Sequence, residues 1–206
     1  VGVDDTRSQV MCTQLSSEGL RHTIPVSAEY GLGRGVSVLD GRLCDSMLGR
    51  AVEPQDVRGA RALPGKHNHQ NAAAAYAACR ALGMEPTDIL AGIATFPGLP
   101  HRLEMIGTID GVRFVNDSKA TNAQAAEQAL RAYPDAYWIV GGRPKEEGID
   151  DLAPLFSTVK KAYLIGESTE TFARVLEGRL DAEKCRTVDV AVEAAFRDAR
   201  ASGDAN

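Results

Sequence analysis

Residues 136–165 read AYWIVGGRPKEEGIDDLAPLFSTVKKAYLI, and this stretch decides the fold class. It predicts a strand over 136–140, a helix over 150–159 and a second strand over 162–165. Two short apolar strands joined by a helix indicate a βαβ unit with parallel strands and a right-handed crossover. We therefore expect an α/β fold with a largely parallel sheet.

The same alternation of strands and helices continues on both sides of this unit. Residues 96–100 read FPGLP, and two prolines with one glycine in so short a stretch form the strongest break in the sequence. We therefore expect two domains, residues 1–98 and 99–206. In the second domain the pattern adds a hairpin with strands over 102–109 and 112–115, helices from Thr121, Ser168 and Asp189, and a short strand near 186–188.

The first domain is predicted to mix short strands with longer helices. Asp40-Gly41 is a hairpin signal, because a two-residue turn of this kind needs positive φ at both positions. Asp4-Asp5-Thr6 follows a short apolar strand and caps a helix that runs to residue 15. The remaining elements are a strand over 22–28, an alanine-rich helix over 67–82 that Gly83 ends, and a helix that starts at Pro86.

The composition is that of an ordinary globular protein, with 44% hydrophobic residues and a net charge of −5. This balance gives no reason to expect nucleic acid or an anionic membrane as a partner. No apolar run approaches the roughly 18 residues of a membrane-spanning helix. The four cysteines are far apart, which suggests reduced thiols in a cytoplasmic protein. The chain begins at Val1 without methionine, and we expect both of its ends to be cut.

Two polar clusters lie near the predicted helix over 67–82 and the domain boundary. In GKHNHQN (residues 65–71), free N–H groups and the helix dipole favour an anion or a nucleotide. Asn68 and Asn71 lie three positions apart, so one helix face can present both amides to a purine edge, although Asn68 can equally cap the helix. Arg102 follows the rigid turn and suits a bidentate contact with phosphate, or it is simply solvated.

A third polar cluster, NDSKATN at residues 116–122, stands between a predicted strand and a predicted helix. Asp117 can accept hydrogen bonds from ribose hydroxyls or help to hold a metal, and Lys119 can neutralise phosphate. The alternative is that Thr121 or Ser118 only caps the helix.

The fourth cluster is Gly141-Gly142 with Lys145, after the next strand. Glycines let a ligand approach the backbone and a lysine suits a carboxylate, unless this is an ordinary turn. Together the four clusters suggest one site for an anionic ligand, on strand ends of one sheet and in a cleft between the domains. GLGRG at residues 31–35 leads into a strand and not a helix, so it is not a nucleotide loop. His67, His69 and His101 lack the spacing of a metal site, and we expect no metal ligands among these residues.

HNHQN at 67–71, FPGLPHR at 96–102 and NDSKATN at 116–122 resemble motifs of the Mur ligase family, in the same order and spacing. The last two resemble its D-glutamate-adding members more than their siblings. The resemblance covers nearly the whole chain. It implies that residues 1–98 are the C-terminal part of a central ATP-binding domain. Residues 99–206 would then be most of a Rossmann-like, amino-acid-binding C-terminal domain.

The resemblance also implies a reaction. With ATP and magnesium as cofactors, a monomeric ligase of peptidoglycan synthesis would phosphorylate the L-alanine carboxylate of UDP-N-acetylmuramoyl-L-alanine, and the D-glutamate amine would attack the acyl phosphate. Arg102 and Lys119 would be catalytic. The ligand contacts implied by the resemblance are adenine for Asn68 and Asn71, ATP for His101 and Arg102, ribose for Asp117, phosphates for Lys119, and D-glutamate for Thr121 and Lys145.

The sequence departs from the family pattern in three ways. The glycine-rich phosphate loop, the upstream lysine that is carbamylated in the family and a downstream serine are absent, so we expect this chain alone to be inactive. Two other readings stay open. One is a sibling ligase with a different amino acid, including the folate-polyglutamate type. The other is a non-catalytic protein that binds a nucleotide sugar.

Overall fold

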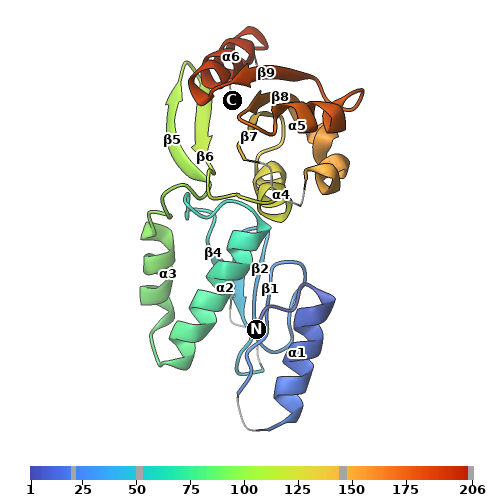
Figure 1. The fold of residues 1–206 in the computed structure, drawn as a ribbon. Coiled ribbons are helices and arrows are strands. Elements are labelled where there is room, and N and C mark those ends of the chain that lie inside the picture. Colours follow the sequence, from blue (N-terminus) through green and yellow to red (C-terminus); the bar gives the residue numbers. More distant parts are fainter. Residues whose placement is uncertain (20–21, 50–52, 144–147, 204–206) are drawn as a thin grey trace. The chain divides into compact units, whose positions relative to one another are not determined.

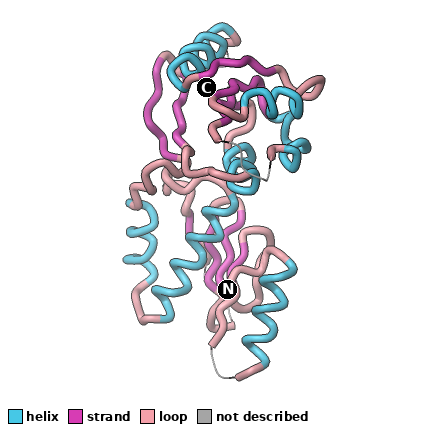
Figure 2. Tube along the Cα trace, in the orientation of Figure 1, coloured by secondary structure: helices cyan, strands magenta, loops and turns pink. Residues whose placement is uncertain are grey.

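The computed structural model describes residues 1–19, 22–49, 53–143 and 148–203. The chain divides into two compact units, Val1–Gly98 and Leu99–Asn206 (Figure 1). Helices and strands occur in both units, as the colouring of Figure 2 shows. Each unit buries hydrophobic side chains of its own, so each can be described by itself.

The first unit packs helices against a small mixed sheet. The sheet order is β1 (Val26–Ser27), β2 (Val36–Leu39), β3 (Arg42–Asp45) and β4 (Gln55–Asp56), and the helices are α1 (Thr6–Ser17), α2 (Lys66–Ala81) and α3 (Pro86–Thr95). β1 pairs with β2 in parallel, whereas the other pairs are antiparallel. The strand predicted over 22–28 is confirmed only for Val26–Ser27, and β4 was not predicted.

The first residues of the chain continue this sheet beyond β1. The Val26 N–H donates to the Val1 carbonyl oxygen at 2.8 Å, and the Val3 N–H donates to the Val26 carbonyl oxygen at 3.0 Å. Asp5 then caps α1, since its carboxylate accepts a hydrogen bond from the Ser8 N–H at 3.0 Å. The predicted passage from a strand into a capped helix is confirmed.

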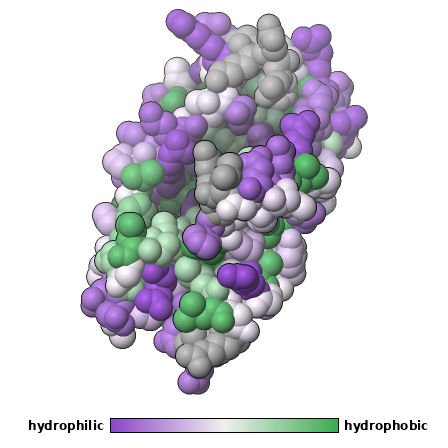
Figure 3. Space-filling view, turned by 90° about the horizontal axis from the view of Figure 1, so that it is seen from below, coloured by the Kyte–Doolittle hydropathy of each residue, from purple (hydrophilic) through white to green (hydrophobic). Residues whose placement is uncertain are grey.

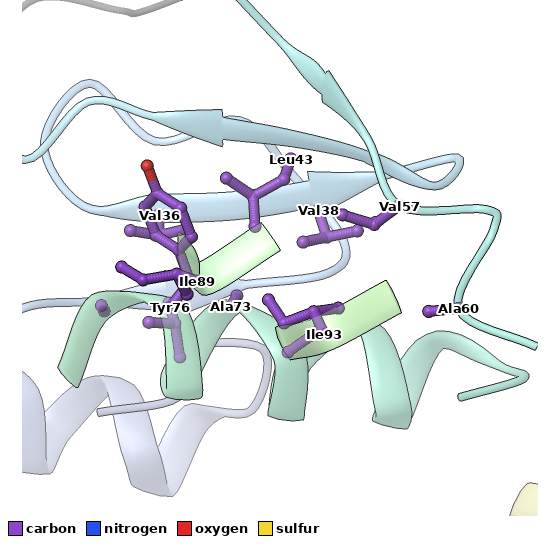
Figure 4. Packing of buried hydrophobic residues seen from close by; sticks show 12 residues of the cluster. Val36, Val38, Leu43, Val57, Ala60, Ala73, Tyr76, Ile89 and Ile93 are labelled. Atoms are coloured by element: carbon purple, nitrogen blue, oxygen red, sulfur yellow. The ribbon is translucent and has the colours of Figure 1, made fainter. Parts of the chain in front are cut away.

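The core of the first unit lies between the sheet and the helices α2 and α3 (Figure 4). Val36 and Val38 of β2 are fully buried, and Figure 4 shows them on the side of the strands that faces Ala73 and Tyr76 of α2. Small alanine side chains let α2 lie close to the strands, which is how a helix of this composition buries its inner face. The alanine run therefore serves packing.

The second unit alternates strands and helices along the chain. Its strands are β5 (Glu104–Ile109), β6 (Val112–Asn116), β7 (Ala136–Gly141), β8 (Val159–Ile165) and β9 (Ala182–Arg186), and its helices are α4 (Ala123–Ala132), the 3-10 helix η1 (Asp150–Thr158), α5 (Thr169–Leu176) and α6 (Val188–Ala201). β7, β8 and β9 form a parallel sheet in that order, which confirms the predicted βαβ units. The segment η1 is not the α-helix expected there. Pro154 lies inside it and lacks the N–H that an α-helical turn needs.

Both predicted hairpin turns are confirmed. Asp40 and Gly41 have φ angles of 48° and 73°, and Asp110 and Gly111 have φ angles of 50° and 82°. Positive φ at both central residues produces a turn whose twist matches that of the flanking strands. Two short Asp-Gly sequences therefore encode the β2–β3 and β5–β6 pairings.

The expectation that the polar clusters follow strands of one sheet is wrong. β5 and β6 form a separate two-stranded antiparallel sheet, so Asn116 does not end a strand of the parallel sheet. Contacts with α6 hold the hairpin: Phe114 and Phe196 have ring centroids 5.7 Å apart, and Arg200 lies 3.4 Å from Asp110. Such distant contacts decide which sheet a strand joins.

The parallel sheet is covered on both faces. Along β8, Ala162 and Leu164 belong to the hydrophobic cluster that includes residues of α4, η1 and α5, whereas Tyr163 and Ile165 pack with residues of α6. Successive strand residues point to opposite faces, so this alternation gives each face its own core. Figure 1 shows α6 and α4 on opposite sides of β7–β9.

On the face drawn in Figure 3, hydrophobic residues form small groups among hydrophilic ones. Across the described residues, none of the helices is both long and apolar enough to pass through a membrane. The four cysteines are free thiols.

Candidate functional site

The turns before β5 and after β6 meet at the base of the β5–β6 hairpin. The Lys119 N–H donates to the His101 carbonyl oxygen at 3.1 Å, and the Leu103 N–H donates to Asp117 Oδ1 at 3.0 Å. Two of the predicted clusters are thus one cluster in space. We call it the hairpin-base cluster, and its members are His101, Arg102, Asn116, Asp117 and Lys119.

The backbone of this cluster has an unusual conformation. His101 and Leu103 have φ angles of 65° and 45°, in the left-handed region that residues with a Cβ seldom adopt. Such conformations cost on the order of 1–3 kcal/mol each and persist only where the surroundings impose them. Here Asp117 holds the Leu103 N–H, and the Leu103 side chain is buried. Strain maintained in this way is common at ligand sites.

The His101 imidazole lies between an amide and a carboxylate. Asn116 Nδ2 is 2.8 Å from His101 Nδ1, and Asn116 Oδ1 accepts a hydrogen bond from the Ser118 N–H at 3.1 Å. Glu104 Oε2 accepts from the His101 backbone N–H at 2.8 Å and lies 4.0 Å from Nδ1. The His101 side chain is 54% exposed, so its ring is oriented by protein contacts and still open to a ligand.

Arg102 and Lys119 are exposed members of the same cluster. Their main chains lie at the same turn, where the Lys119 N–H binds the His101 carbonyl oxygen, and two cations at one turn suit a ligand with several negative oxygens. Thr121 is also exposed, in the segment that leads to α4.

The predicted alternative of a cap by Thr121 or Ser118 is wrong. Asn122 caps α4, since its side-chain oxygen accepts from the Ala125 N–H at 2.8 Å. Asn122 has the extended backbone of a cap, with φ of −148°. Thr121 therefore lies outside the helix, one residue before its cap.

The loops after β7 and β8 are locked together. A Cβ on Gly141 would lie 2.0 Å from the Ile165 carbonyl oxygen, so only glycine fits. The hydroxyl and the N–H of Ser168, which is 1% exposed, both donate to the Gly142 carbonyl oxygen at 3.0 Å. Packing of the two strand ends accounts for Gly141 without a ligand. Lys145, expected here to hold a carboxylate, lies outside the described residues.

In the first unit, Asn68 and Asn71 lie at the start of α2. Asn71 Nδ2 donates to Asn68 Oδ1 at 3.3 Å, so the two amides share one helix face, as their spacing predicted. The cap reading of Asn68 is wrong, because α2 starts at Lys66 and its N-cap is Gly65. Asn68 Nδ2 instead donates to the Pro64 carbonyl oxygen at 2.8 Å.

A network that the sequence analysis missed ties the start of α2 to the sheet. The Asp4 carboxylate accepts from Gln70 Nε2 at 2.6 Å, from the Ser27 hydroxyl at 2.5 Å and from the Ala28 N–H at 2.8 Å. Asp4 directly follows the strand residues 1–3, a position from which a carboxylate reaches a neighbouring helix start. That position was read only as part of a helix cap.

The three histidines of the polar clusters have different surroundings. Burial lowers the pKa of His69, in the first turn of α2, more than the nearby Asp40 carboxylate raises it. His67 lies in the same turn, whereas His101 belongs to the other unit. Within the part of the chain that the structure describes, three or more His, Cys, Asp and Glu side chains nowhere gather as metal ligands would.

Residues 101–205, which include the hairpin-base cluster and the parallel sheet, match the family described as "Mur ligase, glutamate ligase domain". The chain belongs to the Mur ligase family. The resemblance carried by the sequence motifs is confirmed by this match over half of the chain.

Curated relatives named UDP-N-acetylmuramoylalanine--D-glutamate ligase match almost the whole length of this chain. The protein of Caulobacter vibrioides is 52% identical over 204 residues, that of Phenylobacterium zucineum 51% over 203, and that of Rhodospirillum rubrum 47% over 203. These matches cover 97–99% of this chain but 43% of each relative. The chain therefore spans less than half the length of the relatives that it matches.

Solved structures share the fold. MurF from Acinetobacter baumannii has a TM-score of 0.64 at 21% identity, with 99% of this chain and 46% of that chain covered. E. coli FolC in complex with DHPP and ADP has a TM-score of 0.62 at 24% identity, with 90% of this chain and 44% of that chain covered. The predicted α/β fold of a Mur ligase is thereby confirmed.

Proposed function

We propose that this chain is part of an ATP-dependent ligase that joins D-glutamate to UDP-N-acetylmuramoyl-L-alanine in peptidoglycan precursor synthesis. Relatives 47–52% identical to it carry the name of that enzyme. In the proposed reaction ATP phosphorylates the L-alanine carboxylate, and the D-glutamate amine then attacks the acyl phosphate and releases phosphate. Residues 1–98 would complete the central ATP-binding domain, and residues 99–206 would form most of the amino-acid-binding domain.

The hairpin-base cluster is the observation that supports this chemistry best. Its strained turn is fixed by hydrogen bonds from and to the segment 116–120, and both Arg102 and Lys119 belong to it. Phosphoryl transfer needs cations held in place where negative charge spreads over the phosphoryl oxygens. Arg102 and Lys119 would neutralise that charge, His101 would contact ATP, and Asp117 would accept from the ribose hydroxyls while it holds the turn.

The other ligand contacts follow the sequence motifs. Asn68 and Asn71, which share a helix face, would contact adenine, and Thr121 and Lys145 would hold D-glutamate. Magnesium would be held by the ATP phosphates. We propose further that the enzyme is a monomer of the cytoplasm, where ATP and the nucleotide sugar are available.

The test is phosphate release by the full-length protein with ATP, magnesium and UDP-N-acetylmuramoyl-L-alanine. D-glutamate, L-glutamate, L-lysine and no amino acid would be compared. Release that depends on D-glutamate alone is the expected result. Release with another amino acid would make the protein a sibling ligase, and no release from folded protein with any of them would overturn the proposed activity.

A pair of arginine variants tests the role of the cluster. Arg102→Lys keeps the charge but loses the two-pronged geometry, so we expect kcat/KM for ATP to fall at least about tenfold. Arg131→Lys is the matched control, because Arg131 lies exposed on α4 and pairs only with Glu127, at 2.8 Å, among the ion pairs described. Equal activities of the two variants would contradict the role of Arg102.

A further inference from the structure

We propose that Asn116 is a positioning residue, which fixes neutral His101 as the tautomer with its hydrogen on Nε2. His101 then offers the nucleotide a hydrogen-bond donor, and not a lone pair or a base. The tautomer follows from contacts within the second unit. Its use toward a nucleotide rests on the function proposed above.

The orientation of the Asn116 amide is decided by the backbone. Its Oδ1 lies 3.1 Å from the Ser118 nitrogen, and a backbone N–H can only donate. Turning the amide over would bring its NH2 group against that N–H, two donors face to face with no acceptor between them. The oxygen therefore faces Ser118, and the Nδ2 hydrogens face His101.

The orientation of the amide in turn decides the state of the imidazole. His101 Nδ1 lies 2.8 Å from Asn116 Nδ2, a hydrogen-bond distance that requires Nδ1 to accept. A neutral imidazole has one N–H, so the hydrogen is on Nε2. Glu104 would favour a hydrogen on Nδ1, but its Oε2 lies 4.0 Å from that nitrogen and already accepts the His101 backbone N–H at 2.8 Å.

The backbone keeps the ring in this position. The His101 N–H is bound by Glu104 and its carbonyl oxygen by the Lys119 N–H at 3.1 Å, while its φ is 65°. Both polar groups of the residue are therefore engaged on either side of its Cα. The Cα of His101 is thereby held in place, and the 2.8 Å contact with Asn116 orients the ring.

This tautomer matches a ligand whose oxygens only accept. Phosphate oxygens repel a lone pair on nitrogen and accept an N–H. With Arg102 and Lys119 in the same cluster, an Nε2–H adds a third donor without adding a third charge. Asn116 thus sets what His101 can recognise, although Asn116 need not touch the ligand.

The first test is the tautomer itself in the 206-residue chain. Long-range proton–nitrogen correlation NMR of the labelled chain, at a pH where the imidazole is neutral, separates a protonated ring nitrogen from an unprotonated one. His101→Gln assigns the signal among the four histidines. We expect His101 Nδ1 to be unprotonated. A protonated Nδ1 in the unmodified chain would overturn the proposal, and His101→Gln serves only to assign the signal.

Free imidazole already favours a hydrogen on Nε2, so reversal is the sharper test. In Asn116→Asp the carboxylate replaces the donating amide and accepts, which moves the hydrogen to Nδ1. Asn122→Asp is the matched control: it adds the same charge in the same loop and keeps an oxygen that can cap α4. We expect reversal in the first variant only. An unchanged tautomer in Asn116→Asp would refute the proposal that Asn116 determines the tautomer of His101.

The second test concerns the ligand and uses the full-length enzyme. Asn116→Asp should raise the KM for ATP at least about tenfold with a smaller effect on kcat, and Asn122→Asp should change it less than about twofold. A reversed tautomer without a change in KM would refute the donor role of His101. If the unmodified enzyme releases no phosphate with any amino acid, the proposed function fails, and the NMR result still decides the tautomer.

Discussion

Replacing Asp198 by asparagine should destabilise the second unit by about 1–2 kcal/mol at neutral pH. Asp198 Oδ2, on α6, accepts from Lys161 Nζ at 2.7 Å and from the Tyr163 hydroxyl at 2.8 Å, both on β8. The side chains of Lys161 and Asp198 are 20% and 24% exposed. The pair is thus better shielded from water than ion pairs on the surface, which contribute little.

The size of the effect follows from the pKa of Asp198. Hydrogen bonds from Lys161 and Tyr163 lower that pKa from 3.8 to about 2, against the smaller effect of burial. At about 1.4 kcal/mol per unit, this corresponds to roughly 2.5 kcal/mol. Water screens part of this interaction energy, and an asparagine at position 198 can still accept the hydrogen bond from Tyr163. The expected loss of stability is therefore smaller, about 1–2 kcal/mol. Hydrogen bonds to Asp198 and to Glu183 raise the pKa of Lys161 to about 12, and the part due to Asp198 is the same interaction, which is counted once.

The sign of the pH dependence is fixed by the direction of the shift. Because the folded protein lowers the pKa of Asp198, the stabilisation is complete above about pH 5 and is lost as the pH falls from about 4 to 2. The difference in unfolding free energy between the unmodified chain and Asp198→Asn should therefore shrink by roughly half between pH 7 and pH 3.

The assay uses the single tryptophan of the chain. Trp138 lies in β7, so its fluorescence during a urea titration follows the unfolding of the second unit. Glu193→Gln is the control, because Glu193 is an exposed carboxylate on the same helix. This substitution should change the free energy of unfolding by less than about 0.5 kcal/mol. An Asp198→Asn effect no larger than that of the control at pH 7, or one that is equal at both pH values, would refute the reasoning.

Three other predictions test separate parts of the chain. Gly141→Ala should destabilise the second unit by more than about 3 kcal/mol, because the new Cβ would lie 2.0 Å from the Ile165 carbonyl oxygen; a smaller loss of stability by Trp138 fluorescence would contradict that close approach. Tyr76→Phe removes the hydroxyl that donates to buried Asp45 Oδ2 at 3.1 Å. Hydrogen exchange of peptides from α2 should then show that the free energy of opening falls by about 1–2 kcal/mol, and unchanged protection would count against this hydrogen bond. The 206-residue chain alone should show no ATP turnover in a phosphate-release assay, and measurable turnover would contradict the need for the missing phosphate loop.

Features that one or two residues decide could be predicted from the sequence. Asp-Gly pairs marked both hairpins because few residues tolerate positive φ at two successive positions. Asp5 marked the start of α1 for a similarly local reason. Prediction failed where several neighbouring side chains can accept the same hydrogen bond. Thr121, Ser118 and Asn122 can all accept an N–H, and only the backbone at Asn122 selects the cap of α4.

Features that depend on distant contacts were not predictable in this way. β4 consists of the exposed residues Gln55 and Asp56, so no alternation of apolar and polar residues indicates a strand there. The pattern also could not show that β5 and β6 leave the parallel sheet, since contacts with α6 hold them. The polar clusters were detectable as excess polarity in short loops. The hydrogen bonds that join Asn116 to His101 and Asp4 to Gln70 were not, because each joins segments that are far apart in the sequence.

The geometry of the hairpin-base cluster depends on a turn at the other end of the hairpin. The Asp110-Gly111 turn fixes a register in which Glu104 lies opposite Asn116, with one irregularity between Met105 and Gly107. A shift by one residue would turn every side chain of one strand to the opposite face. Asn116 would then no longer meet His101, whatever residues stood beside them. Two residues with positive φ at the far turn therefore help to determine which nitrogen of a distant imidazole carries its hydrogen.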